Sequence, residues 1–227
     1  MSRAYLCVTI DTECDKGKGW RSPLAEGLEF GDLSGDVRIL PGQVRISSID
    51  GTLYGGSIKG ETTVKWGSQA DADGRFNLAG VDLGQLLPAI GSGFSASGAL
   101  DANMTFSSQG IKFVELFAAP RVTATFALRK GVINKIDVGR ALQSSSGHGG
   151  KTPFDEITGE AQVAGGRTAY RNLNLNSASM KASGAIDVSP KAELSGRINV
   201  LLGTQTAIVA RGTLNVGGSS MNPLLAP

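Results

Sequence analysis

Short runs in which apolar and polar residues alternate, separated by glycine-rich turns, make up most of this chain from Gly27 onward. Val37, Ile39, Val44 and Ile46 belong to such runs, and turn-forming pairs of the types Pro-Gly, Asp-Gly and Gly-Gly separate the runs. A period of two places successive side chains on opposite faces of a strand. The pattern therefore predicts a series of β-hairpins.

Two segments interrupt these strands with the spacing of a short helix. Residues 81–91 (VDLGQLLPAIG) and 136–145 (IDVGRALQSS) each have an Asp near the start, aliphatic residues three and four positions apart, and Gly or Ser at the end. An aspartate at such a start accepts hydrogen bonds from the free N–H groups of the first helical turn. We expect the first helix to follow a strand over 75–80 and the second to follow a hairpin over 121–135.

Beyond Phe154, strand-like runs follow one another almost without interruption. Leu173 and Leu175 alternate with asparagines, which predicts a sheet with one apolar face and one polar, uncharged face. Two short helices cannot cover a dozen or so strands, so the sheet must curl on itself, pack on another sheet, or leave an apolar trough for a ligand. The predicted fold is mainly β: a large curled antiparallel sheet, groove-like or sandwich-like, of many short strands with two short helices.

Aliphatic residues of the late strands are the candidates for lining an apolar trough of this kind. Alternation alone does not distinguish a ligand-binding face from a dry sandwich core, so both interpretations stay open for these residues. The candidates are Leu173, Leu175, Ile186, Val188, Leu194, Ile198, Val200, Ile208, Leu214 and Val216.

The composition argues against an enzyme and against a nucleic-acid partner. The 227 residues include 32 Gly and a single His, which leaves few side chains for acid–base chemistry. Lys and Arg are scattered singly at a net charge of +2, so no basic stripe faces a phosphate backbone. Cys7 and Cys14 indicate neither a disulfide framework nor a cysteine-based zinc site. We predict no catalytic residue, no metal site and no cofactor, and we interpret His148, within the Ser- and Gly-rich linker 144–153, as a solvated loop residue.

Several ordered landmarks resemble the C-terminal region of AsmA-like proteins. They are the Tyr-Gly-Gly at 54–56, the pair of Asp-containing helical segments, the Thr-x-Phe at 152–154 and the Ser-x-x-Met-x-x-x-Gly at 177–184, and the resemblance spans about residues 27–227. It implies an envelope protein of Gram-negative bacteria that lies in the periplasm and is anchored to the inner membrane by a segment absent from this chain. Relatives of this group are associated with outer-membrane assembly and with phospholipid transfer between membranes.

The resemblance and the predicted apolar face together give three hypotheses about function. The first is a non-enzymatic module that shelters lipid acyl chains in an apolar β groove, in outer-membrane biogenesis or intermembrane phospholipid transport, with phospholipid or another envelope lipid as its partner. The alternative is a structural or interaction module of outer-membrane protein assembly, whose exposed sheet edges bind envelope proteins. The third and least favoured is a remnant polysaccharide deacetylase.

The deacetylase hypothesis depends on the first residues of the chain. The stretch YLCVTIDTECD is similar to the opening strand of polysaccharide deacetylases, in which an acidic run supplies a base and a metal ligand. Asp11 matches the base, but Thr12 follows it, so Glu13 or Asp15 would have to replace the ligand. Such a zinc site also needs several histidines, and this chain has one, which excludes that catalysis. We therefore expect residues 1–26 to be a foreign-looking segment, fused or wrongly assigned as a start, and residues 27–227 to be the AsmA-like β domain.

Overall fold

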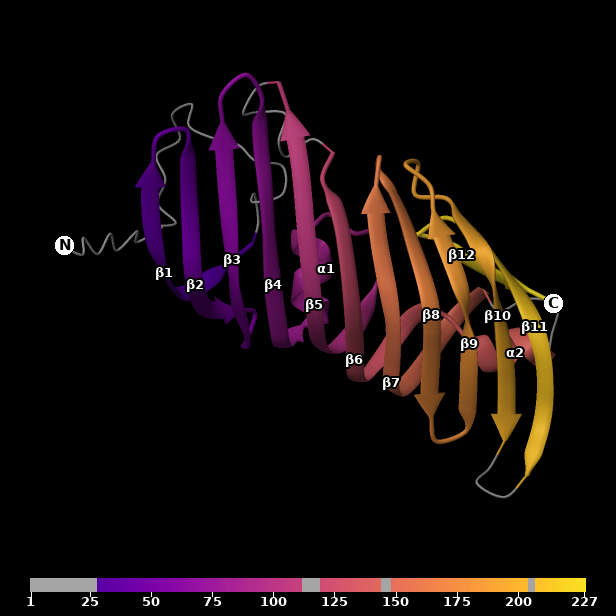
Figure 1. The fold of residues 1–227 in the computed structure, drawn as a ribbon. Helices are drawn as coiled ribbons and strands as arrows, with labels where there is room; N and C mark the ends of the chain where they lie inside the picture. Colours follow the sequence, from indigo (N-terminus) through magenta and orange to yellow (C-terminus); the bar gives the residue numbers. More distant parts are fainter. Residues whose placement is uncertain (1–27, 112–118, 144–147, 204–206) are drawn as a thin grey trace.

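A single antiparallel sheet accounts for most of the computed structural model, which describes residues 28–111, 119–143, 148–203 and 207–227. Within these residues, twelve strands lie side by side in chain order, from β1 at one edge to β12 at the other (Figure 1). The strands are β1 (Phe30–Leu40), β2 (Gln43–Leu53), β3 (Gly56–Trp66), β4 (Ala70–Asp82), β5 (Ala96–Gly110), β6 (Arg121–Ile136), β7 (His148–Ala164), β8 (Arg167–Ser177), β9 (Met180–Val188), β10 (Leu194–Gly203), β11 (Ile208–Gly218) and β12 (Pro223–Ala226).

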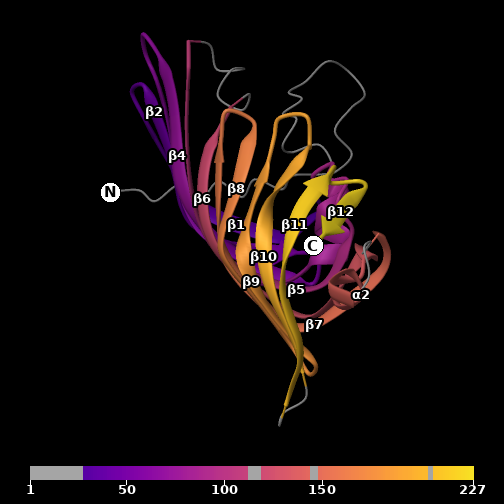
Figure 2. The same cartoon turned by 90° about the vertical axis from the view of Figure 1, so that its right-hand side faces the viewer.

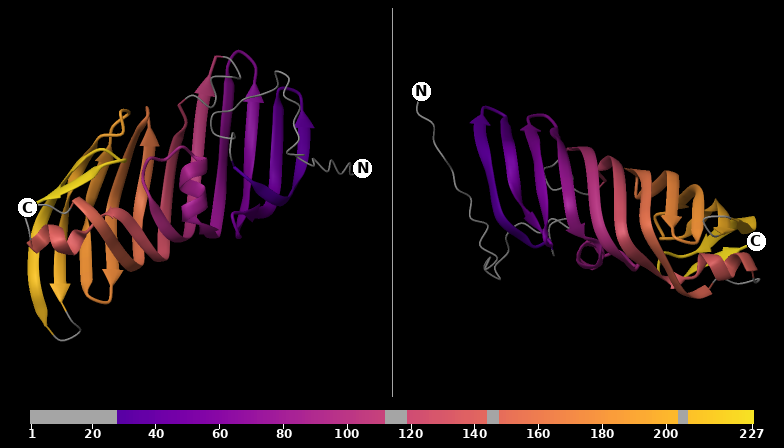
Figure 3. Two further views of the ribbon diagram at one scale, coloured as in Figure 1. Left: turned by 180° about the vertical axis from the view of Figure 1, so that it is seen from behind. Right: turned by 90° about the horizontal axis from the view of Figure 1, so that it is seen from below.

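Both helices and the last strand lie on the same side of this sheet. Figure 2 shows α2 and β12 on one side of the long strands, and the left view of Figure 3 shows α1 and α2 in front of them. We call this side the inner face and the opposite side the outer face. Strand β12 pairs with β11 but also contacts β6 and β7, so the end of the sheet curls over the inner face. The predicted curled antiparallel sheet with two short helices is confirmed.

The two helices begin where the sequence predicts them. Helix α1 (Leu83–Ala89) starts after Asp82, whose Oδ1 accepts a hydrogen bond from the backbone N–H of Gln85 at 3.1 Å. Helix α2 (Val138–Gln143) starts after Asp137, whose Oδ1 accepts one from the N–H of Arg140 at 2.9 Å. Each aspartate satisfies a donor that the first helical turn leaves unpaired. Neither described helix has the length and hydropathy of a membrane span.

The hairpin expected over residues 121–135 is wrong. Strand β6 runs without a turn from Arg121 to Ile136 and pairs with β5 on one side and β7 on the other. Lys130 has a positive φ of 50°, and the register with β5 shifts between Ser97 and Ala99. The Lys-Gly pair therefore forms a bulge, which kinks a strand without reversing it.

The linker expected over residues 144–153 is shorter than predicted. Strand β7 already begins at His148, whose backbone pairs with Ile136. Residues 144–147 and the His148 side chain lie outside the described residues. So does the segment 1–27, with Asp11, Glu13 and Asp15.

Buried apolar side chains gather on the inner face in two main clusters. The larger one joins α2 and β12 to strands β6 to β11. The smaller one lies under β1 to β6, with Leu86 of α1 packed against it. The larger cluster consists of Ile136, Val138, Ala141, Phe154, Ile157, Leu175, Met180, Val200, Leu214, Val216 and Leu225. The smaller consists of Leu53, Ile58, Leu78, Val81 and Ala102.

Candidate functional site

Strand register aligns apolar side chains in rows on the inner face. Ile58 pairs with Leu78, Leu78 with Ala102, and Ala102 with Phe126, so these residues form one row across β3 to β6. Ile198 pairs with Leu214 in a corresponding position on β10 and β11. Because the side-chain period of a strand is two, the neighbouring row on the same face lies two residues further along each strand. The inner face is therefore the candidate site for an apolar ligand.

The late-strand residues predicted from sequence fall into three environments. Leu175, Val200, Leu214 and Val216 are buried in the larger cluster, and Ile186, Leu194 and Ile198 pack against it, partly buried. Leu173 and Val188 are half-buried outside that cluster. Ile208 lies at the start of β11 and is 67% exposed, apart from the others. At the β10–β11 end, α2 and β12 thus occupy the inner face and make it a packed core.

A different stretch of the inner face is apolar but not part of a core cluster. Val122 pairs with Val163, Val163 with Thr168, and Thr168 with Val188, which gives a row across β6 to β9. All four are half-buried, and none belongs to a cluster formed by the described residues. Ala124 and Ala161 form a half-buried pair two residues further along β6 and β7. We call Val122, Ala124, Ala161, Val163 and Val188 the central apolar strip.

The strip is continuous with apolar side chains on both sides. Phe106 of β5 pairs with Val122, and Leu194 of β10 pairs with Val188, so the row spans six strands. Five intervals of about 4.8 Å give the row a length of roughly 24 Å. Half of a bilayer's hydrocarbon core measures roughly 15 Å, which is the depth that one acyl chain fills. The row is therefore long enough for an extended acyl chain.

Tyr170 lies beside the strip, in apolar surroundings. The residue pairs with Ala161 and Ile186, and its ring meets that of Phe126 edge-on, with ring centroids 6.3 Å apart. Burial raises the pKa of the Tyr170 hydroxyl above its usual value near 10. The cause is desolvation, which disfavours the charged tyrosinate. The Tyr170 side chain is thus largely shielded from water.

Alkaline pH is expected to destabilise the protein through Tyr170. Because the folded-state pKa lies above the unfolded-state value, stability is intact below pH 10 and falls as the pH rises through the folded-state pKa, by up to about 1.4 kcal/mol per pH unit. Tyr170→Phe removes this dependence. Urea unfolding at pH 9 and pH 11 is the measurement, and equal losses in the variant and the parent would show that the Tyr170 hydroxyl is well solvated.

The outer face is polar, and several of its charges are paired across strands. Glu61 accepts from Arg75 at 2.9 Å and from Arg45 at 3.4 Å, and the Asn77 amide donates to Asn103 at 2.8 Å. Arg129 bridges Asp101 and Glu156, and Arg171 pairs with Asp187 at 2.6 Å.

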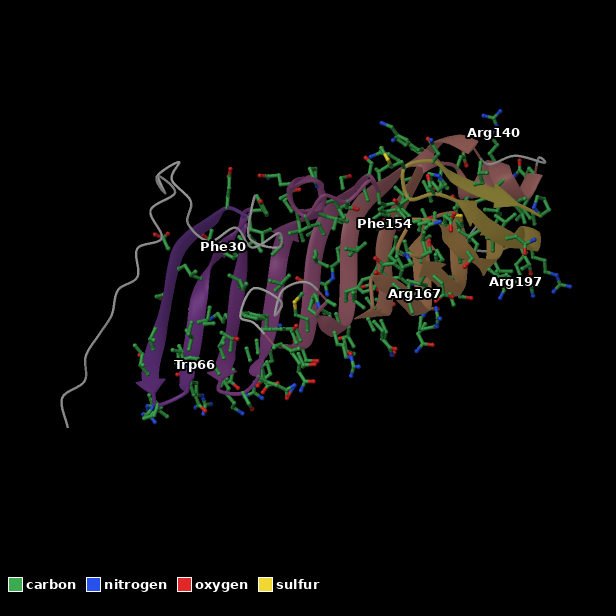
Figure 4. All side chains as sticks on the ribbon, turned by 90° about the horizontal axis from the view of Figure 1, so that it is seen from above. Phe30, Trp66, Arg140, Phe154, Arg167 and Arg197 are labelled. Carbon is green, nitrogen blue, oxygen red and sulfur yellow. The ribbon has the colours of Figure 1, made fainter. Side chains whose placement is uncertain are left out.

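Figure 4 shows how the charged side chains are distributed between the two faces. Arg167 and Arg197 reach away from the side on which α2 lies. Across the described residues, no three His, Cys, Asp or Glu side chains gather in a way that could hold a metal ion. The sheet therefore has an apolar inner face and a solvated, polar outer face.

Most of the candidates predicted from sequence lie on the inner face, and one of them, Val188, belongs to the central apolar strip. The candidate list was drawn from the late strands, whereas the strip begins on β6, where Val122 and Ala124 alternate with threonines. That alternation is readable from the sequence and could have brought Val122 into the list. Strand β12, whose Leu225 helps to fill the inner face, has no comparable signal, because it contributes four residues.

Comparison with known proteins adds one finding. The model of the AsmA family matches residues 20–173. Searches of curated proteins and of solved structures found no match. The matched range ends within β8, and the sheet continues without interruption through β9 to β12.

Proposed function

Because the chain belongs to the AsmA family, we propose that it is a non-enzymatic envelope module that shelters lipid acyl chains on its apolar inner face. Membership in this family indicates an envelope-associated role in lipid transport or outer-membrane biogenesis. In our proposal the module lies in the periplasm, and its partner is a phospholipid or another envelope lipid. Acyl chains lie along the central apolar strip while headgroups stay in water.

One observation carries this proposal. The row from Phe106 through Val122, Val163 and Val188 to Leu194 is apolar at five of its six positions, and its central residues belong to no core cluster of the described chain. Apolar surface of this kind favours contact with another apolar body over contact with water. A flexible hydrocarbon chain fits a single row of apolar side chains better than a globular partner does.

Energetics support a passive, reversible mechanism. Each methylene removed from water contributes about 0.8 kcal/mol, so eight methylenes along the strip contribute roughly 6 kcal/mol before the cost of ordering the chain. This gain is large enough for capture from water and small enough for release to a membrane. No bond is made or broken, so the proposed activity needs no catalytic residue.

Val122→Asp is the direct test. The substitution places a carboxylate within the strip, where an acyl chain would have to desolvate it. We expect phospholipid that co-purifies with the protein from a Gram-negative envelope, measured by mass spectrometry after extraction, to fall at least tenfold. Because Val122 is only half-buried, the charged side chain can reach water and the sheet should stay folded, which circular dichroism checks.

Thr123→Asp is the matched control. Thr123 is the next residue of β6, lies on the outer face, and is exposed. The Thr123→Asp substitution adds the same charge to the same strand and should leave the lipid content unchanged. Equal lipid content in Val122→Asp and the parent protein, or no lipid in the parent, contradicts the proposal.

An interaction module of outer-membrane protein assembly is the second candidate, favoured by the free edge of β1. Among the described residues, β1 pairs with β2 alone, and its register is irregular between Gly31 and Asp36. An open edge can accept a strand from another protein. This function predicts a lipid-free protein that loses an envelope partner when proline substitutions block the edge.

A further inference from the structure

A small cationic pocket lies on the molecule away from the central apolar strip. It has a volume of about 340 Å³ and is lined by Asn134, Lys135, Gly149, Gly150, Lys151 and Asn222. These residues come from β6, from the start of β7, and from the turn between β11 and β12. The pocket thus joins segments that are more than seventy residues apart in the chain.

Facing irregularities in β6 and β7 create the pocket. Asn134 pairs with Lys151, and Ile136 pairs with His148, so Lys135 on one strand and Gly149 and Gly150 on the other fall between the pairs. All three have positive φ values, of 67°, 78° and 87°. At Gly150 a Cβ atom would also lie 2.9 Å from the Cβ of Asp137. Glycine is required here, and it leaves backbone N–H groups open to close approach.

Two ammonium groups dominate the charge of this pocket. The Nζ of Lys135 donates a hydrogen bond to the carbonyl of Met221 at 3.3 Å. This bond holds the Lys135 side chain against the β11–β12 turn. Lys151 is exposed and forms no ion pair with a described residue. The carboxylate of Asp137 lies near Gly150, but its Oδ1 accepts the N–H of Arg140 at the start of α2. The pocket therefore has an excess of positive charge.

We infer that this pocket binds a phosphate-type anion, either free phosphate or the phosphate of a lipid headgroup. Two lysines outweigh the single carboxylate of Asp137, and lysine binds phosphate as a compact point charge with three donors. The side-chain amide of Asn222 adds further donors, and that of Asn134, which donates to the Ser95 hydroxyl at 3.1 Å, has a second N–H. The volume exceeds that of a bare oxyanion and leaves room for an ester substituent. This inference stands on the pocket alone and does not depend on the lipid-sheltering function.

An NMR titration of the whole chain with two probes tests the site. Inorganic phosphate and monomeric dihexanoyl phosphatidic acid are added separately, at constant ionic strength, while backbone amide resonances are followed. We expect saturable shifts at Gly149, Gly150 and Asn222 with either probe. At least tenfold tighter binding of the phosphatidic acid identifies a headgroup site, and equal affinities identify a site for free phosphate.

Charge-removing variants decide whether the pocket is responsible. Lys151→Gln and Lys135→Gln should each weaken phosphate binding at least tenfold. Lys181→Gln removes an exposed lysine of β9 outside the pocket and should have no effect. Lys151 is exposed, so its variant should melt at the same temperature as the parent. The absence of saturable shifts at the pocket, or equal weakening by Lys181→Gln, overturns the inference.

Discussion

Leu214→Ala is expected to lower the free energy of unfolding by about 3 kcal/mol. Leu214 is fully buried, with an exposed fraction of 0%, in the cluster where α2 and β12 close over the inner face. Truncating it removes buried methyl groups and leaves a cavity that the sheet, held by strand pairing on both sides, cannot collapse. In urea unfolding the midpoint should fall by about 1 M, with an unchanged slope.

Leu201→Ala is the control for this prediction. Leu201 lies on the neighbouring strand β10, directly opposite Arg211, and is 41% exposed. The same chemical change there should alter stability by less than about 0.5 kcal/mol. Similar losses at Leu214 and Leu201 would mean that α2 and β12 do not seal this end of the inner face, and that the late strands line an open groove instead.

Gly131→Ala is the second large effect, with an expected loss of about 3 kcal/mol or more. A methyl group on Gly131 would overlap the carbonyl oxygen of Ser97 on β5 and the ring of Phe154 on β7. Backbone atoms of a paired strand cannot move aside without breaking hydrogen bonds, so the strain is not relieved. Thermal unfolding should show a much lower melting temperature.

Gly217→Ala is the matched glycine substitution. Gly217 lies in β11, and no heavy atom is within 4 Å of the position that a Cβ atom would occupy. Its variant should unfold at nearly the parent temperature. A tolerated alanine at Gly131 would contradict the continuous β6 strand and would favour the hairpin that the sequence predicts there.

Local features of this protein follow from the sequence alone. Alternation identifies the strands and their two faces, because the side-chain period of a strand is independent of what covers it. Asp82 and Asp137 identify the helix starts, because capping involves only residues three positions apart. The landmarks in the sequence also point to the AsmA family, which the match over residues 20–173 confirms.

Features that depend on distant segments were decided by the tertiary structure. Lys130 and Gly131 resemble a turn, yet pairing of β6 with both neighbours makes them a bulge. The sequence does not distinguish Leu214, which is covered by α2 and β12, from Val122, which lies outside the core clusters. Both residues alternate with polar neighbours. Alternation determines which face a side chain joins, whereas burial depends on which remote segment packs over it, and that contact has no local signal.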